Sequence, residues 1–119
     1  MDETTANDIA PRGELIFLKK ERFLIYRAYD LRCIFDKYGS IGKIMLAFEN
    51  LQGLGAMEFG SNELQMIADI VMFGLQHEEN PVDSDYILKN ASMGDFVEYA
   101  EAMSKALIAS LPKPKANLT

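Results

Sequence analysis

The stretch from residue 63 to residue 76 places the strongest constraint on how this chain can fold. Between Leu64 and Leu75 only Gln65 and Asp69 are clearly polar. At helical spacing the apolar side chains cover two sides of a helix. The first side holds Leu64, Ile67, Ala68, Val71 and Leu75, and the second holds Met66, Ile70 and Phe73. A helix that is apolar around most of its circumference must be surrounded by other elements, so we expect a central helix, capped at Ser61 or Asn62.

Asp69 is the unusual residue of this helix, and two interpretations are open. The spacings of four and seven residues allow a narrow exposed stripe with Gln65 and Gln76, which we favour. The alternative is a buried carboxylate, which would cost on the order of several kcal/mol if it had no partner. Its partner would then be a cation of the same chain or a group across a subunit interface. The candidate cations are Arg27, Arg32 and Lys43.

Length, charge and cysteine content limit the class of protein. A chain of 119 residues with 49% hydrophobic residues suits one domain with one core. Its 12 basic and 18 acidic residues give a formal charge of -6, which argues against binding to nucleic-acid phosphates. Cys33 is the only cysteine, so we expect a reducing compartment. Residues 1–8 lack the basic and apolar parts of a signal peptide, and the central stretch is too short to span a bilayer, so we expect a cytoplasmic protein.

Two short apolar runs, residues 15–18 and 23–26, follow a polar and acidic leader at residues 1–13. Both runs contain aromatic or β-branched residues, and the charged residues 19–22 separate them. This pattern predicts a β-hairpin, although the connection lacks the Asn-Gly or Asp-Gly pair that would define its turn type. An amphipathic helix over residues 18–26 is the alternative.

Helical spacing then continues to the end of the chain. One helix is predicted from Leu31, Ile34, Phe35 and Tyr38, and it ends at Gly39. A second begins with Ser40 as its cap and presents Ile41, Ile44, Met45, Phe48 and Leu51. Three glycines between residues 52 and 60 predict a loop.

Beyond the central helix, Asp83 or Ser84 can cap a short helix that ends near Asn90. Ser92 and Asp95 have the spacing of a capping box at the start of the last helix. That helix presents Phe96, Tyr99, Ala100, Met103 and Leu107 on one face. Pro112 and Pro114 prevent its continuation, so residues 112–119 form a flexible tail. The prediction is a mainly α fold: one domain at residues 14–111, with an N-terminal β-hairpin on a bundle of five helices.

No motif in the chain predicts catalysis. His77, Glu78 and Glu79 suggest a metal or acid–base site, but the second histidine of a zinc-protease motif is missing, so we favour a solvated helix end. Cys33 is expected to be packed in the first helix rather than to act as a nucleophile. Residues 53–55 lack the glycine and lysine pattern of a phosphate-binding loop. We therefore expect neither an enzyme nor a bound cofactor or metal.

The order of short motifs resembles the tail assembly chaperones of long-tailed bacteriophages and prophages. The likeness covers residues 14–91 and rests on two motifs and their spacing. These are Phe35-Asp36-Lys37-Tyr38-Gly39 at the end of one helix, and Gly74-Leu75-Gln76-His77 followed by Pro81-Val82-Asp83. The resemblance implies a mainly helical protein, often an oligomer or ring, which binds the tape measure protein, keeps it soluble and helps to recruit the major tail (tube) protein. It would act in the cytoplasm of an infected or lysogenic bacterial cell.

Such a chaperone needs an apolar contact surface, and an acidic charge limits its own aggregation. Our candidate contact residues are Leu54, Met57, Phe59, Met72 and Phe73; the alternative is that they belong to the core. A different class of protein, an acidic phage-encoded inhibitor or adaptor that mimics nucleic acid, would carry its acidic residues in rows on one face. The acidic residues here are scattered among lysines, so we rank that hypothesis lower.

Overall fold

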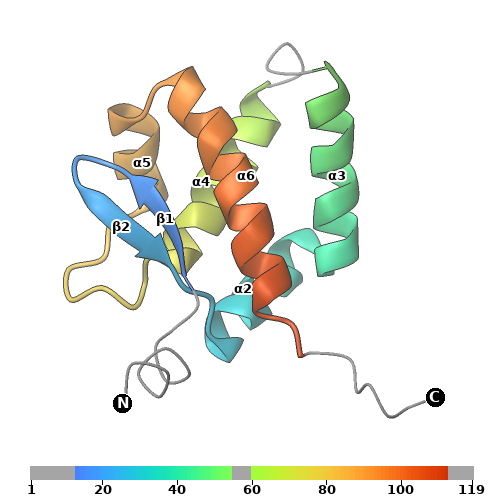
Figure 1. Cartoon of the computed structure of the whole chain (residues 1–119), viewed down its shortest axis with the longest axis horizontal. Helices are drawn as coiled ribbons and strands as arrows, with labels where there is room; N and C mark the ends of the chain where they lie inside the picture. Colours follow the sequence, from blue (N-terminus) through green and yellow to red (C-terminus); the bar gives the residue numbers. More distant parts are fainter. Residues whose placement is uncertain (1–12, 55–59, 113–119) are drawn as a thin grey trace, which may run out of the picture.

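A computed structural model of the chain describes residues 13–54 and 60–112, with side chains for residues 13–49 and 60–112. Within these residues the chain forms an N-terminal hairpin followed by five helices, so the predicted fold class is confirmed (Figure 1). The elements are β1 (Glu14–Phe17), β2 (Glu21–Leu24), α2 (Ala28–Tyr38), α3 (Ile41–Leu54), α4 (Ser61–Gly74), α5 (Ser84–Asn90) and α6 (Met93–Ala109). None of the helices in the described part of the chain is long and apolar enough to cross a membrane.

The two strands pair antiparallel, with Leu15 opposite Phe23 and Ile16 opposite Arg22. The hairpin prediction is therefore confirmed, and the helical alternative is wrong. Three residues connect the strands, and Lys19 in the middle has a φ of 67°, in the left-handed region that a tight reversal needs. The Leu18 N–H donates to the Lys20 carbonyl at 2.9 Å, which closes the turn.

Helix α4 lies at the centre and contacts α2, α5, α6 and β2, as its all-round apolar surface predicts. In Figure 1 it runs behind α6, with the hairpin and α5 on one side. Its fully buried residues are Ile67, Ala68, Ile70, Val71 and Gly74, with Leu75 just beyond its end. The predicted cap is wrong, because Gly60 precedes the helix and Ser61 is already helical. Glu63 stabilises the start instead, since its Oε1 accepts from the Gly60 N–H at 2.9 Å.

Gly74 allows the hairpin to approach α4 closely. The Ile25 N–H donates to the Gly74 carbonyl at 2.9 Å, and the Tyr26 hydroxyl donates to the Ile70 carbonyl at 2.8 Å. A Cβ at position 74 would lie 2.9 Å from Tyr26 Cζ, closer than real Cβ atoms approach, and 3.0 Å from Leu24 Cδ2, which is tighter than most. Glycine at this position is thus required by packing between two elements and not by its backbone conformation.

The remaining helices begin largely as the sequence predicts. Asp83 Oδ1 accepts from the Tyr86 N–H at 2.9 Å, and Ser92 and Asp95 exchange bonds of 3.1 and 2.9 Å in a capping box. The whole predicted face of α6 is buried. On α2, Ile34 is buried but Phe35 is exposed.

Helix α3 continues to Leu54, so the prediction of a loop from residue 52 is wrong at its start. Gly53 lies within the last turn, where a glycine costs only about 1 kcal/mol and can be tolerated. Residues 55–59 of that loop lie outside the described residues, as do the predicted leader and tail except for Gly13 and Pro112.

Candidate protein-binding surface

Asp69 is buried, with 3% of its surface exposed, so the favoured prediction of an exposed stripe is wrong. Its carboxylate accepts four hydrogen bonds from three helices. Oδ2 accepts from Lys37 Nζ at 2.7 Å and from the Tyr38 hydroxyl at 2.5 Å. Oδ1 accepts from the Ser84 hydroxyl at 2.6 Å and from Gln65 Nε2 at 2.9 Å. The alternative of a buried and paired carboxylate is therefore the correct one.

The cation is Lys37, which was not among the three candidates. Gln65 does lie on the same side as Asp69, one turn earlier, but it donates to the carboxylate. Gln76 turns elsewhere, and its amide donates to the Met72 carbonyl at 3.1 Å. The end of α2 and the start of α5 cover the side of α4 that was expected to face solvent. The spacing of residues along one helix does not show which other helices pack against it.

The bonds to Asp69 also determine its charge. Burial alone would raise the pKa of this carboxyl group, but donation by Lys37, Ser84, Tyr38 and Gln65 lowers it to about 2. Burial and the neighbouring carboxylate raise the pKa of the Tyr38 hydroxyl. An ionised carboxylate offers roughly four acceptor positions, and here four donors occupy them. Asp69 therefore holds α2, α4 and α5 together, and its oxygens are not available to a substrate or a metal ion.

His77 and Glu78 also bind inside the fold rather than forming a joint site. His77 Nε2 lies 2.7 Å from the Phe23 carbonyl oxygen, which can only accept, so this nitrogen carries the hydrogen. Glu78 Oε1 lies 2.7 Å from Arg22 Nη1, and Arg22 is 8% exposed. Both contacts join the segment that follows α4 to β2. Among the described residues, no group of three or more His, Cys, Asp or Glu side chains is placed to hold a metal ion.

The predicted contact residues fall into two groups. Met72 and Phe73 are partly buried and pack against the core, so only part of each side chain is open to a partner. Met57 and Phe59, together with the side chain of Leu54, lie outside the described residues. Their predicted role in binding stays a prediction. Cys33 is a free thiol of intermediate burial in α2, so it is only partly covered and lies outside the buried core.

Three exposed apolar side chains lie together on the outward side of the hairpin. We call Leu15, Phe17 and Phe23 the hairpin face; they are 49%, 63% and 52% exposed. Leu15 and Phe23 are cross-strand partners, and Phe17 lies two residues along β1 on the same side. Ile16 and Leu24 point the other way and are buried. Single exposed apolar residues are common on protein surfaces, but a contiguous group is typical of an interaction site.

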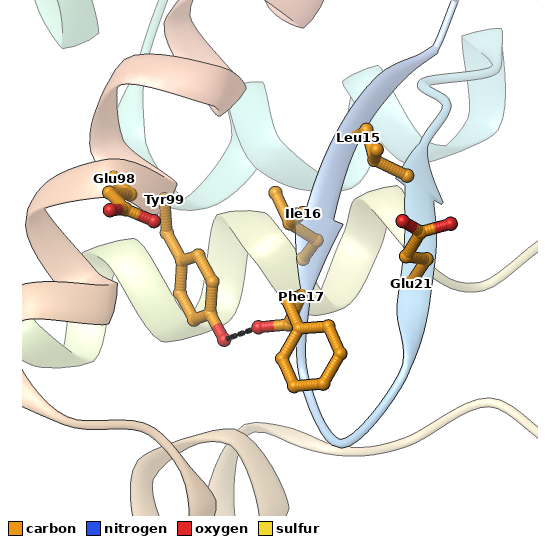
Figure 2. Close-up of a pocket in the computed structure, with 6 residues that line it drawn as sticks. All are labelled: Leu15, Ile16, Phe17, Glu21, Glu98 and Tyr99. Carbon is orange, nitrogen blue, oxygen red and sulfur yellow. Dashed lines mark hydrogen bonds between the residues drawn. The ribbon is translucent and has the colours of Figure 1, made fainter.

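A hollow of about 240 Å³ lies beside this face, between β1 and α6 (Figure 2). It is lined by Leu15, Ile16, Phe17, Glu21, Glu98 and Tyr99. The Tyr99 hydroxyl donates to the Phe17 carbonyl at 2.6 Å, which links the outer edge of β1 to α6. Figure 2 shows Glu98 on α6 and Glu21 on β2 on opposite sides of β1.

No protein-family model, no curated protein and no solved structure matches the chain. The hairpin face was missed at the level of sequence, although a signal for it existed. Residues 15–18 are four consecutive apolar residues in a predicted strand, and successive side chains of a strand point to opposite sides. Because only one side of a two-stranded sheet can pack on the helices, half of such a run must face outward.

Proposed function

We propose that this chain is a non-enzymatic assembly factor that binds other proteins, of the kind to which its motifs are similar. In this proposal it is a tail assembly chaperone of a long-tailed bacteriophage or prophage. It binds the tape measure protein, keeps it soluble and helps to recruit the major tail protein, in the cytoplasm of an infected or lysogenic bacterial cell. It acts without a cofactor.

The exposed hairpin face carries this proposal. Full burial of a Leu or Phe side chain contributes roughly 1.5–3 kcal/mol, and about half of each of these three side chains is still accessible. A partner that covers Leu15, Phe17 and Phe23 would therefore gain several kcal/mol at most before the costs of association. An affinity of this size suits a chaperone, which must release its client during assembly. The internal roles of Asp69 and Glu78 support the non-enzymatic part of the proposal.

Co-expression with the tape measure and major tail proteins tests the proposal. We expect the chain to keep the tape measure protein soluble and to co-purify with it. The double substitution Phe17→Thr and Phe23→Thr keeps strand propensity but removes two rings from the hairpin face, and should abolish co-purification. Tyr29→Ala with Leu46→Ala is the matched control, because it removes two equally exposed apolar side chains from α2 and α3. If the unaltered chain neither solubilises nor retains either protein, the proposal is wrong.

Self-association is a separate part of the proposal, since the chaperones that the motifs resemble often form oligomers or rings. Light scattering over a range of concentrations measures it directly. A strict monomer at high concentration would remove the ring and leave client binding intact. Phe73→Asp then separates two roles of the central helix. We expect this variant to lose its fold, because Phe73 packs against the core; a folded variant that no longer assembles would place Phe73 at an interface.

A further inference from the structure

The size of the hollow beside the hairpin face limits what can occupy it. Pockets that hold small molecules usually have volumes of about 300–1,000 Å³, and this one is smaller, at about 240 Å³. Leu15, Ile16 and Phe17 contribute apolar atoms to its lining. A hollow of this size accommodates a side chain or two of a protein segment better than a metabolite.

The charges around the hollow are negative. Glu21 and Glu98 are exposed carboxylates, and no cationic residue is among the six that line the hollow. The pKa of Tyr99 is raised to about 12, first by burial and then by the negative charges of Asp95 and Glu98, against the opposing effect of Arg22. Arg22 points to the inner side of the sheet, where it is paired with Glu78.

Besides Arg22, the hairpin carries two cations in its turn, Lys19 and Lys20, both exposed. Neither forms part of the lining. The two glutamates lie on opposite sides of β1 and its apolar side chains (Figure 2). A segment that crosses the strand therefore meets a carboxylate, then apolar atoms, then a second carboxylate.

We infer that the hairpin face and its hollow bind a basic and apolar segment of a protein partner. Apolar side chains of that segment cover Leu15, Phe17 and Phe23, and Lys or Arg residues place their charged ends at Glu21 and Glu98. Long basic side chains suit this arrangement because their aliphatic stems can lie on apolar surface while the charged end stays in water. This inference rests on the proposed function only in that the hairpin face binds protein, and it adds the chemistry of the partner.

The carboxylates disfavour other partners at this surface, because they would repel the phosphates of a nucleic acid or an anionic lipid headgroup. The Tyr99 hydroxyl bonds to the Phe17 carbonyl of β1 and so competes with a partner strand for that carbonyl. Exposed ion pairs add little affinity, but they discriminate between partners of opposite charge.

A pair of peptides tests the inference. The first is a short fluorescein-labelled peptide of repeated Lys-Leu-Ala units, and the second has Glu in place of every Lys. Fluorescence anisotropy gives the affinity of each, and NMR shifts of Leu15, Phe17 and Phe23 locate the contact. We expect the lysine peptide to bind more tightly than its glutamate counterpart, with the difference shrinking as salt is raised.

Substitutions then assign the effect to the two carboxylates. Glu21→Gln with Glu98→Gln should weaken binding of the lysine peptide about two- to five-fold per carboxylate. The control, Asp36→Asn with Glu49→Gln, removes the same charge from exposed positions on α2 and α3 and should change affinity much less. The inference is overturned if neither peptide binds, if both bind equally, if shifts occur elsewhere, or if the two double variants behave alike.

The same variants show whether the occupant is a different protein or a second copy of this chain. They also separate the inferred chemistry of the partner from the proposed role in assembly. If Glu21→Gln with Glu98→Gln instead abolishes self-association seen by light scattering, the occupant is a second copy of this chain, and the inference of a different partner is wrong. If the lysine peptide binds as expected but the tape measure protein does not co-purify, the assembly role fails and the inference holds. If the two peptides bind equally, and the tape measure protein still co-purifies with the Glu21→Gln and Glu98→Gln double variant, the inference about the partner's chemistry fails and the assembly role holds.

Discussion

Replacing Asp69 by Asn is the sharpest test of how the helices are held together. Asparagine has nearly the same shape, but it loses the negative charge and one acceptor oxygen. The bonds from the three neutral donors lose their charged acceptor, and only a bond from Lys37 keeps a charged partner. A bond to a charged group contributes roughly 1.5–3 kcal/mol against 0.5–1.5 for a neutral bond. Because Asn can still bond to some of the four donors, we expect a loss of about 2–3 kcal/mol in the free energy of unfolding at pH 7. In a domain of this size that lowers Tm by roughly 10–20 °C.

The lowered pKa of Asp69 gives a second value for its contribution to the free energy of unfolding. The pKa of Asp69 is lowered from 3.8 to about 2, which corresponds to about 2.4 kcal/mol at neutral pH if the whole shift is converted. The Lys37 side chain is 55% exposed and its charge is screened by water, so we take about 1–2 kcal/mol. A depressed pKa stabilises the fold above the unfolded value of 3.8, and the contribution is lost as pH falls toward 2.

Urea unfolding of the unaltered chain and of Asp69→Asn at pH 7 and pH 3 measures both quantities. We expect the stability difference between them to shrink by roughly 1 kcal/mol by pH 3, whereas Asp36→Asn, an exposed carboxylate on α2, should match the unaltered chain at both values. The reasoning is refuted if the free energy of unfolding of Asp69→Asn at pH 7 lies within about 0.5 kcal/mol of that of the unaltered chain and the difference does not change with pH. The four hydrogen bonds to Asp69 would then not stabilise the fold.

Two other predictions concern the contacts between the hairpin and α4. Arg22→Met should lower the free energy of unfolding by roughly 3 kcal/mol, because it leaves Glu78 without its partner. In urea unfolding, Arg22→Met combined with Glu78→Gln should lose less than the sum of the two single losses, and strictly additive losses would contradict a direct pair. Gly74→Ala should destabilise the fold by about 1–3 kcal/mol because the new Cβ meets the Tyr26 ring. Gly94→Ala, where the nearest atom would lie 3.7 Å away, should be neutral or stabilise by about 0.5 kcal/mol. Equal effects in thermal unfolding would show that helix propensity, and not packing, sets the effect of Gly74→Ala.

Local patterns were sufficient for most of the fold. The apolar spacing of residues 64–75 predicts a central helix, and α4 is that helix. Ser92 and Asp95 predict the start of α6 because a capping box is a contact between residues three apart, which needs no tertiary information. The hairpin was predicted from its two apolar runs for the same reason, since strand pairing across a short turn is local.

Features that depend on which elements meet were not predictable in this way. The spacing of Asp69 suits an exposed stripe, but the end of α2 and the start of α5 cover that stripe and supply Lys37 and Ser84. The candidate binding surface depends on the same kind of information. Whether Ile16 or Phe17 faces outward, and which α6 residues lie beside β1, follows from how the hairpin is placed on the helices.

The sequence by itself determined the helices, the hairpin and the need for one central apolar helix, because these follow from periodicity and from bonds between near neighbours. Only the tertiary structure decided that Asp69 is an internal clamp and that Leu15, Phe17 and Phe23 form the exposed face. The physical reason is that burial of a side chain is a property of the elements packed against it, and those elements are distant in sequence.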